Sequence, residues 1–314
     1  MSKYAHQPLS FQGLKTVPIQ ARGGKVRVEH FGKPYAGGGV NALLDSLPHI
    51  LAADSFRSVV DALANARARK KMIIWGLGGH VIKCGLAPIL IDLMERRYAT
   101  AFALNGAAAI HDFEIAIAGH TSEDVEAVLP DGSFGAAEET GREFNAALKY
   151  ETGFGEALGK HLDEIADPQY ALDSLLFQAY DNATPVTVHV AIGTDTPHTH
   201  PTANGDALGR ATHHDFRLLC SLVKEIDDGG VYLNVGSAVV LPEVFLKAVS
   251  VVRNLGHPLA NFTTVNFDFL QHYRPKVNVV ERPHAQAGGH GYSITGHHEI
   301  MIPLLAAALI ERPS

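Results

Sequence analysis

The chain is poor in the residues and segments that mark several classes of protein. It has two cysteines in 314 residues, Cys84 and Cys220, with no CxxC spacing between them. A disulfide framework is therefore not expected, and buried reduced thiols are the favoured interpretation. No apolar run is long enough to span a bilayer, and residues 1–20 lack the apolar stretch of a signal peptide. These absences predict a cytoplasmic protein with no membrane partner.

Positive charge is also scarce. Lys and Arg number 26 against 33 Asp and Glu, which gives a formal net charge of −7 at pH 7. Without a Lys/Arg-rich face, nucleic acid is not an expected partner. Apolar residues make up 46% of the chain and charged residues 19%, which is typical of a folded protein with an ample core.

Common catalytic motifs are missing as well. The chain contains no HExxH, no GxSxG and no P-loop, so acyl and phosphoryl transfer have little support. The turn after the first apolar strand, Gly76-Leu77-Gly78-Gly79-His80, is not a complete GxGxxG because position 81 is valine. Such a turn can receive a phosphate at the start of a helix, or it can simply need glycine for a tight bend.

What the sequence does have is a regular alternation of short apolar strands and helical segments. Strands are predicted at 72–75, 100–104, 184–191, 231–235 and 262–266. Helices are predicted at 55–70, 138–149, 154–165, 172–180, 214–226, 241–255 and 298–310. This order predicts an α/β fold with a doubly wound, mostly parallel sheet. We expect one such domain over residues 41–314, preceded by an irregular, glycine-bearing arm over residues 1–40.

Polar and small residues follow the predicted strands. Because crossovers between parallel strands are right-handed, these residues should gather along one edge of the sheet and form a binding cleft there. The polar residues near or just after the strand ends are Asn105, His111, Asp112, Thr194, Asp195, Asn234, Ser237, Asn266 and Asp268.

His111 and Asp112 lie early in the helical segment that follows Asn105. Imidazole titrates near neutral pH, so His111 is a candidate general base, with Asp112 orienting it or holding a ligand hydroxyl. A carboxylate near a helix N-terminus is also favoured by the helix dipole, so a structural role for Asp112 stays open.

Histidines also cluster in a polar loop. His198 and His200 are two residues apart, and His213 follows in the next helical segment, so the three could bind a divalent metal ion. The chain has 18 histidines, however, and solvated loop histidines are the alternative interpretation.

The order of these pieces resembles the deoxyhypusine synthase family. The likeness is carried by IIWGLGGHVIKCGLAPILIDLME, AFALNGAAAIHDFE, SLLFQAYDNATPVTVHVAIGTDT, and GGVYLNVGSAVVLPEVFLKAVSVVRNLG with FTTVNFDF, and it covers roughly residues 40–282. The resemblance implies a Rossmann-like subunit of a homotetramer that binds NAD. By the same resemblance, the residues that would contact NAD are Gly78, Gly79, Asn105, Gly106, Asp112, Thr194, Asp195, Gly236, Ser237, Asn266 and Asp268.

Members of that family oxidise spermidine with NAD and transfer its aminobutyl group through an enzyme lysine. At the matching position this chain has Val239-Val240-Leu241, and Lys247 lies further along the helix. The place of the family's histidine base is Ala183. Because an imine needs an amine, the parent reaction is not expected here, although the cofactor site can remain.

Three functions are compatible with the sequence. The favoured one is an NAD-dependent enzyme that acts on a small amine or polar metabolite. The alternatives are a metal-dependent hydrolase or lyase that uses the histidine cluster, and a binding protein without catalytic activity.

Overall fold

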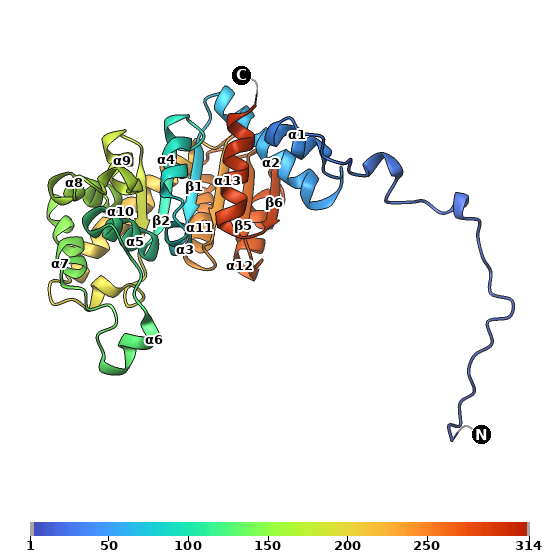
Figure 1. Cartoon of the computed structure of the whole chain (residues 1–314), viewed down its shortest axis with the longest axis horizontal. Coiled ribbons are helices and arrows are strands. Elements are labelled where there is room, and N and C mark those ends of the chain that lie inside the picture. The colour runs from blue at the N-terminus through green and yellow to red at the C-terminus, as the bar shows by residue number, and fades with distance from the viewer. Residues whose placement is uncertain (1–2, 313–314) are drawn as a thin grey trace.

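The computed structural model describes residues 3–312, and its centre is a six-stranded sheet in which every paired strand is parallel (Figure 1). The spatial order is β3-β2-β1-β4-β5-β6. The strands are β1 Ile73–Leu77, β2 Ala101–Asn105, β3 Val186–His189, β4 Val231–Val235, β5 Thr263–Asp268 and β6 His290–Thr295. The prediction of a doubly wound parallel sheet is confirmed. Five of the strands overlap the predicted segments, and β6 was not predicted.

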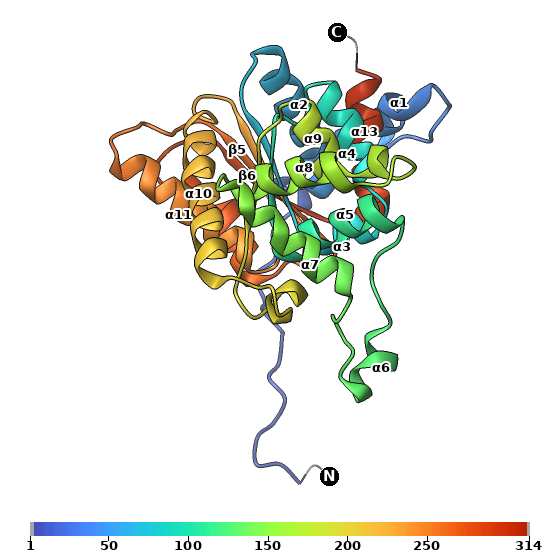
Figure 2. The same cartoon turned by 90° about the vertical axis from the view of Figure 1, so that its left-hand side faces the viewer.

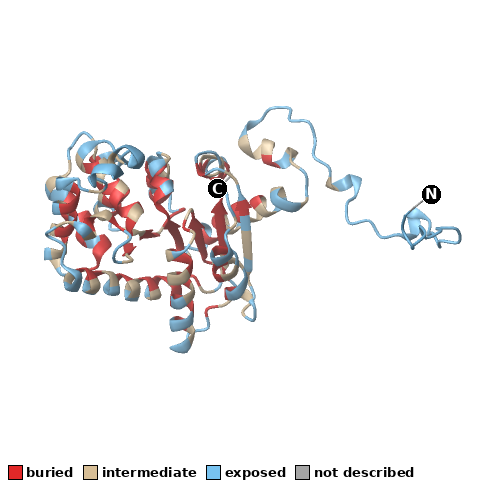
Figure 3. Ribbon diagram, turned by 90° about the horizontal axis from the view of Figure 1, so that it is seen from below, coloured by how far each residue is buried: buried red, intermediate tan, exposed pale blue. Residues whose placement is uncertain are grey.

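Helices cover both faces of this sheet, which explains why its central strands are almost entirely apolar. One buried cluster packs β1 and β2 side chains such as Trp75 and Phe102 against helices α2 (Leu51–Ala68), α4 (Ala87–Glu95), α5 (Gly106–Ala118) and α13 (His298–Ile310). The other cluster packs the opposite face against α10 (Gly205–Lys224) and α11 (Val240–Asn254). Figure 3 shows these buried layers flanking the sheet.

The remaining elements are shorter or lie outside the two main layers. They are α1 Gly39–Ser46, α3 Gly79–Lys83, α6 Val125–Val128, α7 Glu138–Ala146, α8 Phe154–Ile165, α9 Leu175–Asp181 and α12 Tyr273–Pro275, followed by a π-helical turn over Lys276–Glu281. The predicted bounds of α8, α13 and β4 match the structure. Helix α10 begins well before the predicted start at His214, because the side chain of Asn204 caps it by accepting from the N–H groups of Asp206 and Ala207.

Two segments extend from the body of the molecule. Residues 3–38 form two 3₁₀ turns, Ile19–Ala21 and Val28–His30, and are almost entirely exposed; Figure 1 shows this arm running away from the sheet. Residues 119–137, which include α6, leave the end of α5 and project from the body before α7 begins (Figure 2). Within residues 3–312, every helix is too short or too polar to cross a bilayer.

Candidate functional site

The carboxyl edge of the sheet has a topological switch point between β1 and β4. From β1 the chain proceeds to β2 and β3 on one side, and from β4 it proceeds to β5 and β6 on the other. In open α/β sheets, ligands bind in the crevice outside the strand ends at such a point. The turns there are Gly78-Gly79 after β1 and Gly236-Ser237 after β4, so these four residues lie at the switch point.

The two glycine turns touch each other. The N–H of Gly78 donates to the carbonyl of Val235 over 2.9 Å. A Cβ on Gly78 would clash with the carbonyl of Gly236, and Gly236 itself has a φ of +68°. Glycine is therefore needed at both positions for close backbone packing and for a left-handed turn.

The predicted polar residues at the ends of β4 and β5 are buried and make hydrogen bonds to one another or to nearby backbone. The Asn234 Nδ2 donates to Asn266 Oδ1 over 2.7 Å, while the Ser237 Oγ accepts from the N–H of Leu241 at 3.2 Å. Asp268 is buried at the end of β5, with one oxygen 3.9 Å from the His298 Nε2. Asn234 Oδ1 and His298 Nδ1 are buried with no hydrogen-bond partner among the described residues.

The ends of β2 and β3 also meet. Asn105 Oδ1 caps helix α5 by accepting from the N–H of Ala108 at 2.9 Å. The carboxylate of Asp195, from the loop that carries Thr194, lies so close to Gly106 that a Cβ on that glycine would clash with it. Asp195 Oδ2 is 3.9 Å from His198 Nε2, and neither atom has a hydrogen-bond partner among the described residues. Burial raises the pKa of Asp195, although His198 and Thr194 oppose the shift.

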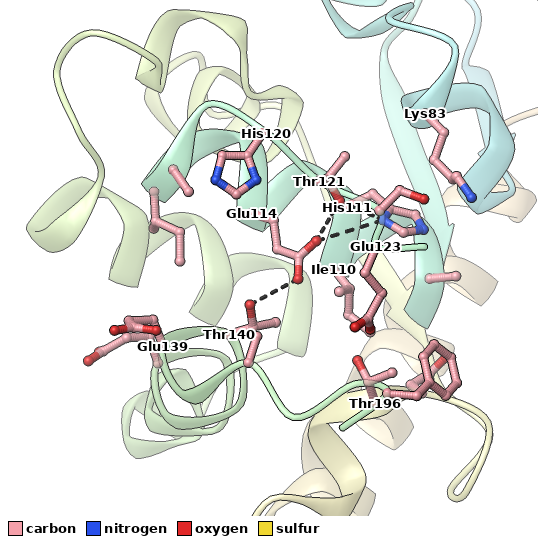
Figure 4. Close-up of a pocket in the computed structure, with 18 of the residues that line it drawn as sticks. Lys83, Ile110, His111, Glu114, His120, Thr121, Glu123, Glu139, Thr140 and Thr196 are labelled. Carbon is pink, nitrogen blue, oxygen red and sulfur yellow. Dashed lines mark hydrogen bonds and ion pairs between the residues drawn. The ribbon is translucent and has the colours of Figure 1, made fainter. Parts of the chain in front are cut away.

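A cavity of about 850 Å³ opens next to this end of the sheet edge (Figure 4). Its walls come from α5, from the projecting segment 119–137 and from α7, and Thr194, Asp195 and Thr196 close one end. Lys83 of α3 lies at its border. Thr194 and Asp195, which follow β3 and which the resemblance assigns to the cofactor, thus line the cavity.

His111 lines the cavity and is held by a chain of hydrogen bonds. Its Nδ1 lies 2.7 Å from the hydroxyl of Thr121, and that hydroxyl donates to Glu114 Oε2 over 2.5 Å (Figure 4). Because Thr121 has one hydroxyl proton and gives it to the carboxylate, it must accept from an Nδ1–H of His111. The His111 Nε2 is then the unprotonated nitrogen of the neutral ring, and it has no hydrogen-bond partner among residues 3–312.

Glu114 is the carboxylate that orients His111. Its second oxygen accepts from the Thr140 hydroxyl at 2.9 Å, and its Oε2 is 3.9 Å from His111 Nδ1. Burial acts to raise the pKa of Glu114, but the contacts with His111, Thr121 and Thr140 outweigh it, and the net pKa lies below its usual value. Glu114 is therefore ionised at neutral pH and can stabilise a positive charge on the imidazole.

Asp112 is placed differently from its predicted role beside His111. It is fully buried, and its carboxylate accepts from the hydroxyl of Ser174 at 2.7 Å and from the N–H groups of Leu175 and Leu176 at 2.8 Å each. It therefore holds the N-terminus of α9 and does not line the cavity. Consecutive helix residues point in different directions, whereas residues three apart share a face, which is why Glu114 and not Asp112 faces His111.

The structure does not bring the three predicted metal ligands together. His200 contacts Thr202 through Nδ1 at 2.8 Å and Glu138 through Nε2 at 3.2 Å. The His198 Nδ1 accepts from the N–H of Gly193 at 3.2 Å, while His213 borders a separate, smaller cavity beside α10.

Sequence reasoning missed most of the cavity. Glu114, Thr121 and Lys83 were not predicted, because the cavity depends on where segment 119–137 folds back. The only sequence signal was the spacing of three between His111 and Glu114. Lys247, the lysine nearest the family's imine-forming position, lies on the exposed part of α11 and pairs with Glu243 at 2.5 Å.

No protein-family model matches the chain, and no curated protein does either. Solved structures are similar in fold at low identity. A conserved protein from Methanococcus maripaludis S2, described as a LOR/SDH protein, is 15% identical, with a TM-score of 0.52 over 83% of this chain and 70% of that one. Unliganded AgrE is 16% identical, with a TM-score of 0.52 over 82% of this chain and 32% of its own.

Two further structures extend the comparison. ArgZ, an arginine dihydrolase from the ornithine–ammonia cycle in cyanobacteria, is 17% identical, with a TM-score of 0.50 over 84% of this chain and 33% of its own. The chain thus spans about a third of AgrE and ArgZ. A protein of Entamoeba histolytica assigned as a deoxyhypusine synthase also matches more weakly, with 10% identity, a TM-score of 0.49, and coverage of 86% of this chain and 91% of that one. At these identities, what is shown is a shared Rossmann-like α/β fold.

Proposed function

We propose that this protein is an NAD-dependent enzyme that acts on a small amine. The single observation that carries the proposal is the position of the His111–Thr121–Glu114 chain: it lies in a cavity that opens directly beside the strand-end edge of a Rossmann-like sheet. AgrE, which is similar in fold, is known in a ternary complex with ornithine and NAD+. That complex supports the choice of cofactor here.

The strand-end residues suit a dinucleotide in their chemistry. Small residues occupy the turns after β1, β2 and β4, so backbone can approach a ligand closely. The buried atoms Asp195 Oδ2 and Asn234 Oδ1 have no partner among the described residues and are available to a polar ligand. The residues that would hold NAD are Gly78, Gly79, Asn105, Gly106, Thr194, Asp195, Gly236, Ser237, Asn266 and Asp268. When bound, this cofactor supplies the site with a hydride acceptor.

His111 acts as the general base in this proposal. Its Nδ1–H is fixed by Thr121, so Nε2 presents a lone pair that can accept a proton from a substrate in the cavity. The imidazolium that results is stabilised by the ionised Glu114 through the hydroxyl between them.

The lining of the cavity favours a positively charged substrate. Five carboxyl groups lie around it, against a single lysine, Lys83. The carboxyl groups belong to Glu114, Glu123, Glu139, Glu143 and Asp195. A surplus of carboxylates attracts an ammonium group and repels an anion. AgrE is known in a complex with ornithine, which carries amines, and this supports the same substrate class.

The first experiment is calorimetric titration with NAD+, followed by a panel of diamines and basic amino acids assayed by the absorbance of reduced nicotinamide. We expect saturable NAD+ binding and turnover of at least one amine. For His111→Gln we expect a fall in kcat of about 100- to 10,000-fold with unchanged affinity for NAD+, as is usual for loss of a general base. Thr121→Val should lower kcat by about tenfold or more, because the ring loses its fixed tautomer.

Two controls make this test specific. Thr196→Val removes a hydroxyl from the same cavity without touching the His111 chain and should leave kcat within about twofold. Asn105→Ser keeps the helix cap of α5 but removes the amide group, so weaker NAD+ binding in this variant would reflect a lost contact with the cofactor. Absence of NAD+ binding at millimolar concentration would reject the proposal. Binding without turnover of any amine would favour the catalytically inactive binding protein instead.

A further inference from the structure

A second group of reactive side chains lies at the same edge of the sheet, outside the cavity. His80 belongs to the short helix α3, Cys84 caps its end, and Glu299 stands in the first turn of α13. The His80 Nε2 is 3.3 Å from the Cys84 Sγ, which is 3.7 Å from the Glu299 Oε2. All three ligand-type atoms lie within 4.8 Å of one another, and among the described residues this is the only such group of three.

The two separations at the Cys84 sulfur match a coordination shell, and the three atoms all lie within 4.8 Å of one another. Zinc bonds of about 2.0 Å to nitrogen or oxygen and about 2.3 Å to sulfur, at tetrahedral angles, place neighbouring ligand atoms roughly 3.3–3.7 Å apart. An imidazole, a thiolate and a carboxylate are all ligands that Zn²⁺ accepts. The spacing of four between His80 and Cys84 turns both toward the same side of α3.

A carboxylate faces the Cys84 sulfur. Burial raises the pKa of the Cys84 thiol, and the charge of Glu299 raises it further. A nucleophilic cysteine needs the opposite arrangement, with a carboxylate behind the histidine and positive charge near the sulfur. A divalent cation placed among the three atoms would reverse the balance, because it stabilises both the thiolate and the carboxylate.

We infer that His80, Cys84 and Glu299 form a binding site for a divalent transition-metal ion, with Zn²⁺ as the best fit. Three protein ligands leave the fourth position of a tetrahedral ion open to water, as in catalytic zinc sites. His297 Nδ1 lies 3.9 Å from the other oxygen of Glu299 and would orient that carboxylate from outside the shell. This site shares no residue with the predicted metal site at His198, His200 and His213, and it does not depend on the proposed function.

The experiment is a titration of chelator-treated full-length protein with Co²⁺, which reports a thiolate ligand by a charge-transfer band in the near ultraviolet, followed by competition with Zn²⁺. We expect one equivalent of Co²⁺, displaced by Zn²⁺, and release of the cysteine proton when the first metal binds. Cys84→Ser should abolish the band and weaken Zn²⁺ at least tenfold. The matched control is Cys220→Ser, which alters the other thiol, on α10, and should leave both the band and the affinity unchanged.

Two further measurements keep the inference open to refutation if Cys84→Ser folds poorly. Glu299→Gln alters an exposed side chain and should retain the band, because the thiolate remains, but weaken Zn²⁺ by about tenfold or more, because one charged ligand is lost. Zn²⁺ should also raise the melting temperature of the unmodified protein and have little effect on that of Cys84→Ser. The assignment is overturned if the protein gives no thiolate band with Co²⁺. It is also overturned if the band survives Cys84→Ser and is lost in Cys220→Ser.

Discussion

Replacement of Asp112 by asparagine tests whether burial or hydrogen bonding has the larger effect on the pKa of this buried carboxyl group. Burial raises the pKa of Asp112 to about 6 from an ordinary 3.8, against the opposing bonds from Leu176, Ser174 and Leu175. Because the folded pKa is the higher one, the native state binds more protons than the unfolded state between these values. The wild-type protein should therefore lose stability as pH rises through this window.

The size of the effect follows from the two pKa values. Asp112 alone should contribute a decrease of about 3 kcal/mol in the free energy of unfolding between acid and alkaline pH, of which about 1.4 kcal/mol falls between pH 5 and pH 8. The asparagine variant has no titrating group at this position. Its amide would also present an N–H₂ group where Oδ2 now accepts from Leu176, which costs about 1–3 kcal/mol. Asp112→Asn should thus be less stable than wild type at pH 5, with a smaller difference at pH 8.

Urea unfolding at the two pH values measures this directly, because the single tryptophan, Trp75, is fully buried in β1 and reports the transition by fluorescence. Asp124→Asn is the control: Asp124 is an exposed helix cap on α6, and asparagine caps equally well, so stability should change by no more than about a few tenths of a kcal/mol. If the difference between wild type and Asp112→Asn grows with pH, the hydrogen bonds outweigh burial and the expected sign is wrong.

Two other predictions can be checked by the same unfolding measurements. Gly78→Ala places a Cβ against the carbonyl of Gly236, so the turns after β1 and β4 must separate, at a cost of about 1–3 kcal/mol in the free energy of unfolding. The control is Gly209→Ala, whose Cβ meets no atom within 4 Å and which should be neutral or stabilising. Equal stability of the two variants would contradict the close approach of the turns. Burial raises the pKa of Asp215 to about 7. Its Oδ2 accepts from the N–H groups of Gly155 and Val188 at 2.9 and 2.7 Å, while its Oδ1 has no hydrogen-bond partner among the described residues. The oxygen of an asparagine amide can therefore keep both bonds. Asp215→Asn should therefore be at least as stable as wild type at pH 8, unlike Asp112→Asn, and a loss of more than about 1 kcal/mol would show that the charge itself is needed.

The sequence was sufficient for most of the fold because the central strands are buried on both faces. Val231–Val235 is apolar enough to be recognised without knowledge of its neighbours, and Phe154–Ile165 has clear helical spacing. Strand β6 gave no such signal: His290, Gly291 and Ser293 interrupt it, since it forms the half-exposed edge of the sheet. Strand β3 is the other edge of the sheet and was predicted, because it is fully buried; the exposure of β6, and not its edge position alone, removed the signal.

The candidate site was only partly predictable. Residues that follow strands were expected to meet, and the contact of Gly78 with Gly236 and the hydrogen bond of Asn234 to Asn266 follow from the strand order. The hydrogen bond between His111 and Thr121 could not be predicted in this way, because it depends on the path of the chain after α5. Such a contact depends on tertiary placement, which no local pattern encodes.

Helix α5 serves two purposes on its two sides. The face toward the cavity carries His111 and Glu114, and the opposite face is bound to α9 through Asp112. Because Asp112 binds this opposite face to the start of α9, helix α5 has little freedom to rotate about its axis. The place of His111 on the helix therefore does not depend on the sequence of the projecting segment 119–137. Under the proposed function, substitutions in segment 119–137 that spare Thr121 should change which molecules enter the cavity, and should leave the rate of proton transfer to His111 largely unchanged.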